Sequence, residues 1–134
     1  MPTDIKNLYA DTNIFLDFFY SRDGTRCTKI REVFQSASEG KVKIIVIPQI
    51  VFELVYVIEK TFGENRSETY RYVSTIVNSR DFEVHQRGVL SKTLDIYRTT
   101  KFDLVDIYLR CLAQNDGSEV FSFDKDLERL KNQL

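Results

Sequence analysis

The sequence of 134 residues is poor in the residues on which several common active sites depend. It contains one histidine, His85, so a histidine-rich zinc site, a two-histidine ribonuclease mechanism and a Ser-His-Asp triad are not expected. Its two cysteines, Cys27 and Cys111, lie far apart and match no metal-binding or redox spacing. We therefore expect two reduced thiols in a cytoplasmic protein.

The sequence also lacks long apolar runs and a large excess of charges of one sign. No run approaches the roughly 20 apolar residues that cross a bilayer, and residues 1–6 lack the basic and apolar regions of a secretory signal. We expect no membrane contact. The formal net charge of −1 argues against a generic basic nucleic-acid coat, but it leaves room for a nuclease with an acidic metal site. We interpret the loose basic cluster of Arg22, Arg26, Lys29 and Arg31 as solvated helix surface.

Short apolar runs recur along the chain, and helical patterns follow most of them. Strands are expected at residues 5–10, 43–47, 82–84 and 120–123. Helices are expected at residues 13–19, 25–39, 48–62, 67–79, 89–98 and 102–114, and from residue 127 onward. The run at 43–47 is continuous and rich in β-branched residues, which is typical of a strand buried on both faces. This order predicts a single three-layer α/β/α domain over residues 1–134, built on a parallel sheet.

Two aspartates directly follow expected strands. Asp11 comes after the first strand, and Asp124 comes after the last. Right-handed crossovers bring the carboxyl ends of parallel strands to one edge of the sheet, where open α/β sheets bind ligands. Thr12 or Asn13 is available as the N-cap of the helix that follows Asp11. Asp126 suits the N-cap of the terminal helix, which leaves Asp124 without a local structural role.

Glu53 stands between apolar neighbours in the helix that follows the second strand. It either belongs to a narrow polar stripe with Gln49 and Lys60 or points into a site, because charged side chains are rarely buried without a partner. Its place in the first turns of this helix favours a site at the same edge of the sheet.

Asp103 and Asp106 lie three residues apart at the start of a largely apolar helix, so they share one face. The helix dipole favours Asp103 at this position. Asp106 lies about a turn further in, and pairing with Arg110 is its structural alternative.

Carboxylates gathered at one edge repel each other by roughly 4 kcal/mol per pair at about 4 Å, for an effective dielectric near 20. Such a cluster is usually retained because it binds a hard cation, and carboxylate oxygens suit Mg²⁺ or Mn²⁺. The residues therefore predict a site for a divalent metal.

Four stretches of this sequence resemble the PIN-domain nucleases, and within that family the VapC-like toxins of bacterial and archaeal toxin–antitoxin systems. The stretches are Tyr9-Ala10-Asp11-Thr12-Asn13-Ile14, the lone acid within residues 48–54, Phe102-Asp103-Leu104-Val105-Asp106-Ile107, and residues 121–127 around Asp124. Each motif alone is weak, but the four in this order make a fairly specific signal.

The resemblance implies a metal-dependent endoribonuclease with a central parallel sheet of four or five strands. Its catalytic acids would be Asp11, Glu53, Asp106 and Asp124, of which Asp11, Asp106 and Asp124 would bind Mg²⁺ or Mn²⁺. Asn13, Asp103 and Ser122 would support them: Asn13 beside Asp11, Asp103 as a second acid near Asp106, and Ser122 as a small hydroxyl residue. The resemblance also implies an RNA substrate, an antitoxin that blocks the pocket, and a homodimer formed through helices.

Two other classes of protein stay open. A catalytically silent PIN-like module would bind RNA or protein, although retention of all four acids argues against it. A phosphatase of the haloacid dehalogenase type also begins with an aspartate after its first strand. That class normally needs a second aspartate two residues later, where this chain has Asn13.

Overall fold

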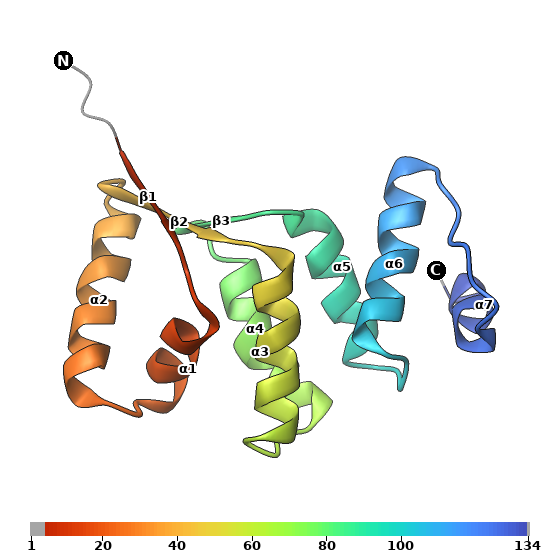
Figure 1. Ribbon diagram of the computed structural model, residues 1–134, viewed down its shortest axis with the longest axis horizontal. Helices are drawn as coiled ribbons and strands as arrows, with labels where there is room; N and C mark the ends of the chain where they lie inside the picture. Colours follow the sequence, from red (N-terminus) through yellow and green to blue (C-terminus); the bar gives the residue numbers. More distant parts are fainter. Residues whose placement is uncertain (1–4, 134) are drawn as a thin grey trace.

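The fold is organised around a short parallel sheet with β2 at its centre. A computed structural model describes residues 5–133. The sheet has the order β1-β2-β3, with strands β1 (Lys6–Tyr9), β2 (Val42–Val46) and β3 (Phe82–Val84), and both pairings are parallel. The β-branched residues of β2 from Ile44 to Val46 are buried, as the continuous apolar run predicted. The α/β class and the parallel sheet are therefore confirmed (Figure 1).

The prediction of four or five strands is wrong for the chain as described, because residues 5–133 form three strands. The expected strand at 120–123 is an irregular segment between two helices, and Phe121 and Phe123 are 92% and 94% exposed. Strand propensity is a local property, whereas a strand forms only beside a partner edge. The helices at either end of this segment keep it away from β1 (Figure 1).

Seven helices cover the described chain, close to the predicted ranges. They are α1 (Thr12–Tyr20), α2 (Gly24–Ser38), α3 (Pro48–Lys60), α4 (Arg66–Val77), α5 (Arg87–Tyr97), α6 (Leu104–Asp116) and α7 (Lys125–Lys131). Pro48 opens α3 at the position where a missing N–H costs nothing. Gly40 follows α2 with φ of 75°, a left-handed conformation that favours glycine.

The N-caps of α1 and α7 differ from those expected. Asp11, rather than Thr12 or Asn13, occupies the N-cap position of α1, without a capping bond from its side chain. The α2 cap is Asp23, whose carboxylate accepts a hydrogen bond from the Arg26 N–H. At α7 the cap is Asp124 instead of Asp126, so Asp124 does have a local structural role.

The hydrophobic core runs from α1 through α3 and α4 to α6 and α7. Phe15, Leu54, Ile107 and Leu130 are among its fully buried members. Figure 1 shows α1 and α2 beside β1, α3 and α4 in the middle, and α5, α6 and α7 on the far side. Within residues 5–133, no helix is long and apolar enough to cross a membrane.

Candidate active site

The first two predicted site residues lie on elements that leave the sheet. Asp11 follows β1 at its carboxyl end and is exposed. Glu53 lies on the exposed face of α3, the helix that leaves β2, where Gln49 and Lys60 are also exposed. The polar stripe considered for Glu53 is therefore present. The helices that follow Asp11 and carry Glu53, α1 and α3, pack against each other.

A second group of acids gathers where α6 and α7 meet. Asp103 is at the N-cap position of α6, and Asp106 is in its first turn. Asp124 caps α7, and its carboxylate accepts a hydrogen bond of 2.8 Å from the Asp126 N–H. The Ser122 hydroxyl in turn accepts a bond of 3.0 Å from the Asp124 N–H, so Ser122 supports Asp124 through the backbone.

Arg110 fixes α7 against α6 and does not pair with Asp106. Its Nε donates to the Leu127 carbonyl at 2.8 Å, and an Nη lies 3.5 Å from the Glu128 carboxylate. The structural alternative for Asp106 is therefore not found. No ion pair in the described part of the chain includes Asp106, which leaves its charge uncompensated.

Electrostatics at the start of α6 reflect this crowding. Partial burial raises the pKa of the Asp106 carboxyl, and the charges of Asp103, Asp124 and Asp126 raise it further. Each of these effects disfavours the ionised form of Asp106. Asp103, Asp124 and Asp126 are therefore close enough to act on Asp106, and a cation at Asp106 would relieve this repulsion.

The structure does not bring the two groups of acids together. Neither Asp11 nor Glu53 is among the charges that shift the pKa of Asp106. Figure 1 shows the carboxyl end of β1 on one side of α3 and the start of α6 on the other. Among residues 5–133, no three carboxylate, histidine or cysteine side chains are close enough together to hold a metal ion. The predicted ligands therefore stand as two half-sites.

The chemistry of these donors, however, fits the metal that was predicted. The three predicted ligands are all carboxylates, as is the fourth predicted acid Glu53, and hard oxygen donors of this kind suit Mg²⁺ or Mn²⁺ better than zinc. Of the three predicted metal ligands, Asp106 and Asp124 lie in the group where α6 and α7 meet, and Asp11 lies at the carboxyl end of β1. The residues thus match a divalent ion in the chemical type of their donor atoms. A match in coordination geometry would require the two groups of acids to come together.

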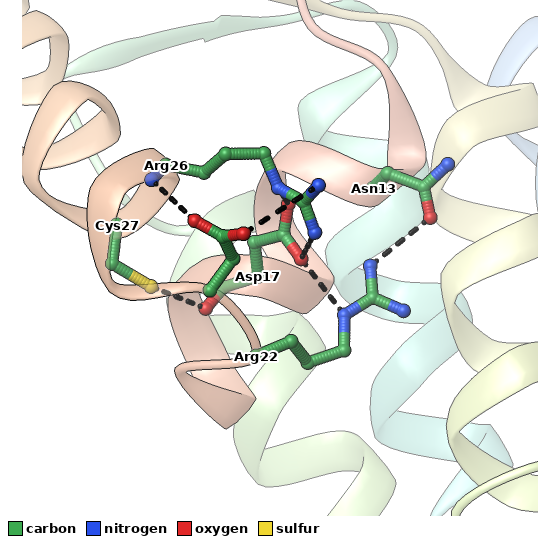
Figure 2. Close-up of polar contacts among 6 residues, drawn as sticks. Asn13, Asp17, Arg22, Arg26 and Cys27 are labelled. Atoms are coloured by element: carbon green, nitrogen blue, oxygen red, sulfur yellow. Dashed lines mark hydrogen bonds and ion pairs between the residues drawn. The ribbon is translucent and has the colours of Figure 1, made fainter.

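An ion-pair network around the buried Asp17 of α1 was not predicted from the sequence. Asp17 is 3% exposed on α1, and its carboxylate accepts hydrogen bonds from Arg22 Nε at 2.8 Å and Arg26 Nε at 2.9 Å (Figure 2). Arg22 also donates to the Asn13 side-chain oxygen at 3.1 Å. Arg22 and Arg26 are exposed, in agreement with their interpretation as solvated surface, but both also pair with the buried Asp17. The available signal was an acid inside the apolar run Phe15–Phe19.

The two arginines also control the charge of Asp17. Burial would raise the pKa of the Asp17 carboxyl, but the hydrogen bonds and positive charges of Arg26 and Arg22 outweigh it and hold that pKa below its usual value. Asp17 therefore stays ionised and keeps a guanidinium against Asn13, two residues after Asp11.

The sequence of this chain is similar to a known protein family and to a named protein. The family model described as the PIN domain matches residues 8–133. A protein of Aquifex aeolicus (strain VF5) named VapC ribonuclease is 27% identical over 121 residues, which cover 90% of this chain and 89% of that protein. No solved structure gives a significant match.

Proposed function

Because the chain belongs to the PIN-domain family, we propose that it is a metal-dependent endoribonuclease that hydrolyses RNA phosphodiester bonds. The observation that carries this proposal is Asp106, which has no ion-pair partner among the described residues and feels the charges of nearby carboxylates, an arrangement with the chemistry of a divalent cation site. The similarity to a protein named VapC ribonuclease supports RNA as the substrate. The three-layer arrangement and the single domain over residues 1–134 belong to the same proposal.

The acids have separate roles in this proposal. Asp11, Asp106 and Asp124 hold Mg²⁺ or Mn²⁺, and Glu53 completes the catalytic set. When bound, the ion neutralises charge on the phosphoryl oxygens and makes water more acidic. Asp11 orients the attacking water in line with the leaving oxygen. Asp103 is a further acid at the start of α6 and assists Asp106.

Asn13 and the arginines that Asp17 holds would bind the RNA backbone. The Nε of Arg22 bonds to Asp17 and one Nη bonds to Asn13, which leaves the other Nη for a phosphate oxygen. Contacts of this kind position the strand without reading its sequence. Since Asp17 fixes the guanidinium before RNA arrives, less side-chain entropy is lost on binding.

The similarity to a VapC protein also supports a place in a toxin–antitoxin pair. In this proposal the chain is the toxin, an antitoxin protein covers the acids, and the active form is a homodimer. A gene for a small basic DNA-binding protein next to this one would support the pairing. Co-purification of the two proteins as a complex without nuclease activity would test it.

Purified protein incubated with single-stranded RNA tests the proposed activity. Cleavage is expected with Mg²⁺ or Mn²⁺ and is expected to stop with EDTA, with Asp11→Asn and with Asp106→Asn. Asp81→Asn is a matched control, because it removes the same charge from an exposed residue outside either half-site. Metal-dependent cleavage that both site variants retain would contradict the assignment of the acids.

The same purified protein also tests the two alternative functions, a silent binding module and a phosphatase. A silent binding module would cleave no RNA and bind no metal in calorimetry. A phosphatase of the haloacid dehalogenase type would release phosphate from small phosphomonoesters without cutting RNA. Asn13 stands where that class needs its second aspartate, which favours the nuclease.

A further inference from the structure

Asp17 is a charged side chain on the buried face of α1. It is 3% exposed, and the residues that precede it, Phe15 and Leu16, belong to the hydrophobic core. A carboxylate taken out of water destabilises the fold unless strong partners compensate it. Even a paired buried acid is often no more stabilising than an apolar side chain of similar size. The stability of the fold therefore does not account for an acid at this position.

Both carboxylate oxygens of Asp17 are occupied by arginines from the far side of the turn after α1. Oδ1 accepts a hydrogen bond from Arg22 Nε at 2.8 Å, and Oδ2 accepts one from Arg26 Nε at 2.9 Å (Figure 2). The arginine side chains are 34% and 60% exposed, whereas the Asp17 side chain is 4% exposed. Asp17 is thus closed to a ligand from solvent, and its effect on one must pass through the two guanidinium groups.

Arg22 determines which end of the Asn13 amide faces solvent. Its Nη2 donates to Asn13 Oδ1 at 3.1 Å. A guanidinium group has hydrogen-bond donors only, so the amide must turn its oxygen toward Arg22. The amide nitrogen then points away from Arg22, as Figure 2 shows. Because Asn13 is exposed, this nitrogen is available as a donor to a molecule from solvent.

A donor at Asn13 selects an anion over a cation. Asn13 lies in the first turn of α1, the helix whose N-cap is Asp11. The first turn of a helix favours negative charge, and phosphate oxygens are strong acceptors. An amide oxygen at the same position would instead attract a metal ion. The bond from Arg22 therefore prepares Asn13 for a phosphate group.

We propose that Asp17, acting through Arg22, sets the orientation of the Asn13 amide, so that Asn13 donates a hydrogen bond from its nitrogen to a phosphate oxygen of RNA. Asp17 is a positioning residue, since it touches Arg22 and not the RNA. Asn13 in this arrangement is a ligand of the substrate and not of the metal. This assignment rests on the proposed function, which supplies RNA as the substrate.

Charge alone and positioning give opposite results for Asp17→Asn. The substitution removes a negative charge, which by electrostatics would strengthen RNA binding. If Asp17 positions Arg22 and Asn13, RNA should bind about 10-fold more weakly, because a hydrogen bond to a charged phosphate is lost or weakened. Fluorescence anisotropy of a labelled single-stranded RNA in EDTA measures the dissociation constant without the proposed cleavage. An Asp17→Asn variant that binds RNA as tightly as the wild type, or more tightly, would overturn the proposal.

Asp23→Asn is the matched control for this substitution. It removes the same charge from an acid that contacts Arg26 rather than Arg22. Asparagine retains the capping role at the start of α2, so the helix should be unaffected. This variant should bind RNA at least as tightly as the wild type. If Asp23→Asn weakened binding as much as Asp17→Asn, a general effect of this turn would replace the specific role of Asp17.

Arg22→Lys tests the same link from the protein surface, which matters if Asp17→Asn fails to fold. Lysine keeps the positive charge but lacks the planar fork that bonds Asp17 and Asn13 together. We expect this variant to keep its helical circular dichroism and to bind RNA about 10-fold more weakly. Wild-type affinity in Arg22→Lys would overturn the proposal.

Asn13→Ala separates positioning from a merely structural role of Asp17. A structural loss would weaken RNA binding by the same factor in either background. A positioning residue loses much of its effect once the group it orients is gone, so Asp17→Asn should cost only about threefold in the Asn13→Ala background. Asn13→Ala itself should weaken RNA binding and leave Mg²⁺ binding in calorimetry unchanged. An equal cost in both backgrounds, or a loss of Mg²⁺ binding with RNA affinity retained, would overturn the proposal.

Binding and cleavage are measured separately, so this proposal and the nuclease can fail independently. If the variants weaken RNA binding as expected but the wild type cleaves no RNA in Mg²⁺, the role of Asp17 is supported and the nuclease is refuted. If the wild type cleaves RNA and Asp17→Asn binds it with unchanged affinity, the nuclease is supported and the role of Asp17 is refuted. A wild type that binds no RNA in EDTA or in Mg²⁺ also refutes the role of Asp17.

Discussion

Asp106→Asn should make the metal-free protein more stable while it removes the response to metal. Burial and the charges of Asp103, Asp124 and Asp126 raise the pKa of Asp106 above its usual value. A raised pKa means that the folded state holds the proton more tightly than the unfolded state. The stability from this group is therefore complete below its ordinary pKa and is lost as the pH rises through the raised one. At neutral pH the ionised Asp106 therefore destabilises the folded state.

The size of the stability change in Asp106→Asn follows from the partly screened charges of its three acidic neighbours. Repulsion by each neighbour is worth about 0.5 kcal/mol at a partly exposed site, or about 1.5 kcal/mol in all. Loss of a negative charge from the first turn of α6 costs about 0.5 kcal/mol through the helix dipole. The net gain of about 1 kcal/mol corresponds to a rise in Tm of about 3–5 °C for a chain of this size.

Thermal unfolding in EDTA and in Mg²⁺ measures both parts of this prediction. In EDTA the variant should melt above the wild type, and the difference should shrink as salt screens the charges. In Mg²⁺ at ten times the dissociation constant, the wild type should gain about 1.4 kcal/mol, and Asp106→Asn should gain much less. Asp81→Asn should respond to Mg²⁺ like the wild type. A variant that melts below the wild type in EDTA and keeps the full Mg²⁺ response would refute the reasoning.

Three further predictions concern the framework around the site. Asp17→Asn should lower Tm, because it leaves Arg22 and Arg26 without their buried partner. Since the pKa of Asp17 is lowered in the folded state, its contribution should be present above the ordinary pKa near 4 and vanish as the pH falls, so melting curves of wild type and variant should converge in acid. Ile107→Ala, at a fully buried position of α6, should cost about 3 kcal/mol in urea unfolding, and a loss below about 1 kcal/mol would contradict the packing. Cys111 is buried with a raised pKa, so DTNB should modify it only after unfolding, and rapid modification of the native protein would contradict its placement.

The sequence predicted the local elements well because their signals are local. The continuous run of β2, Pro48 at the start of α3 and the apolar periodicity of the helices each depend on neighbouring residues. The positions of Asp11 and Asp124 after apolar runs were also visible in the sequence. By contrast, the pairing of residues 120–123 depends on a partner edge far away in the chain, and no local pattern specifies where that edge lies.

Side-chain partners were the least predictable part of the site. Arg110 was weighed as a partner of Asp106, but the main-chain carbonyl of Leu127 takes its Nε. Asp17 was overlooked because a single acid in an apolar helix resembles a surface residue until Arg22 and Arg26 fold back over it. Such contacts depend on how the chain turns between α1 and α2, which spacing alone does not determine.

The central claim is that the carboxylates of this chain cleave RNA with a divalent ion. Its most direct test is the single-turnover rate of cleavage of a labelled single-stranded RNA in Mg²⁺, for the wild type and for Asp11→Asn at the same protein concentration. We expect measurable cleavage by the wild type, and a loss of about 100-fold or more in the variant and in EDTA. Cleavage by Asp11→Asn at the wild-type rate, or a wild-type rate unchanged by EDTA, would contradict it.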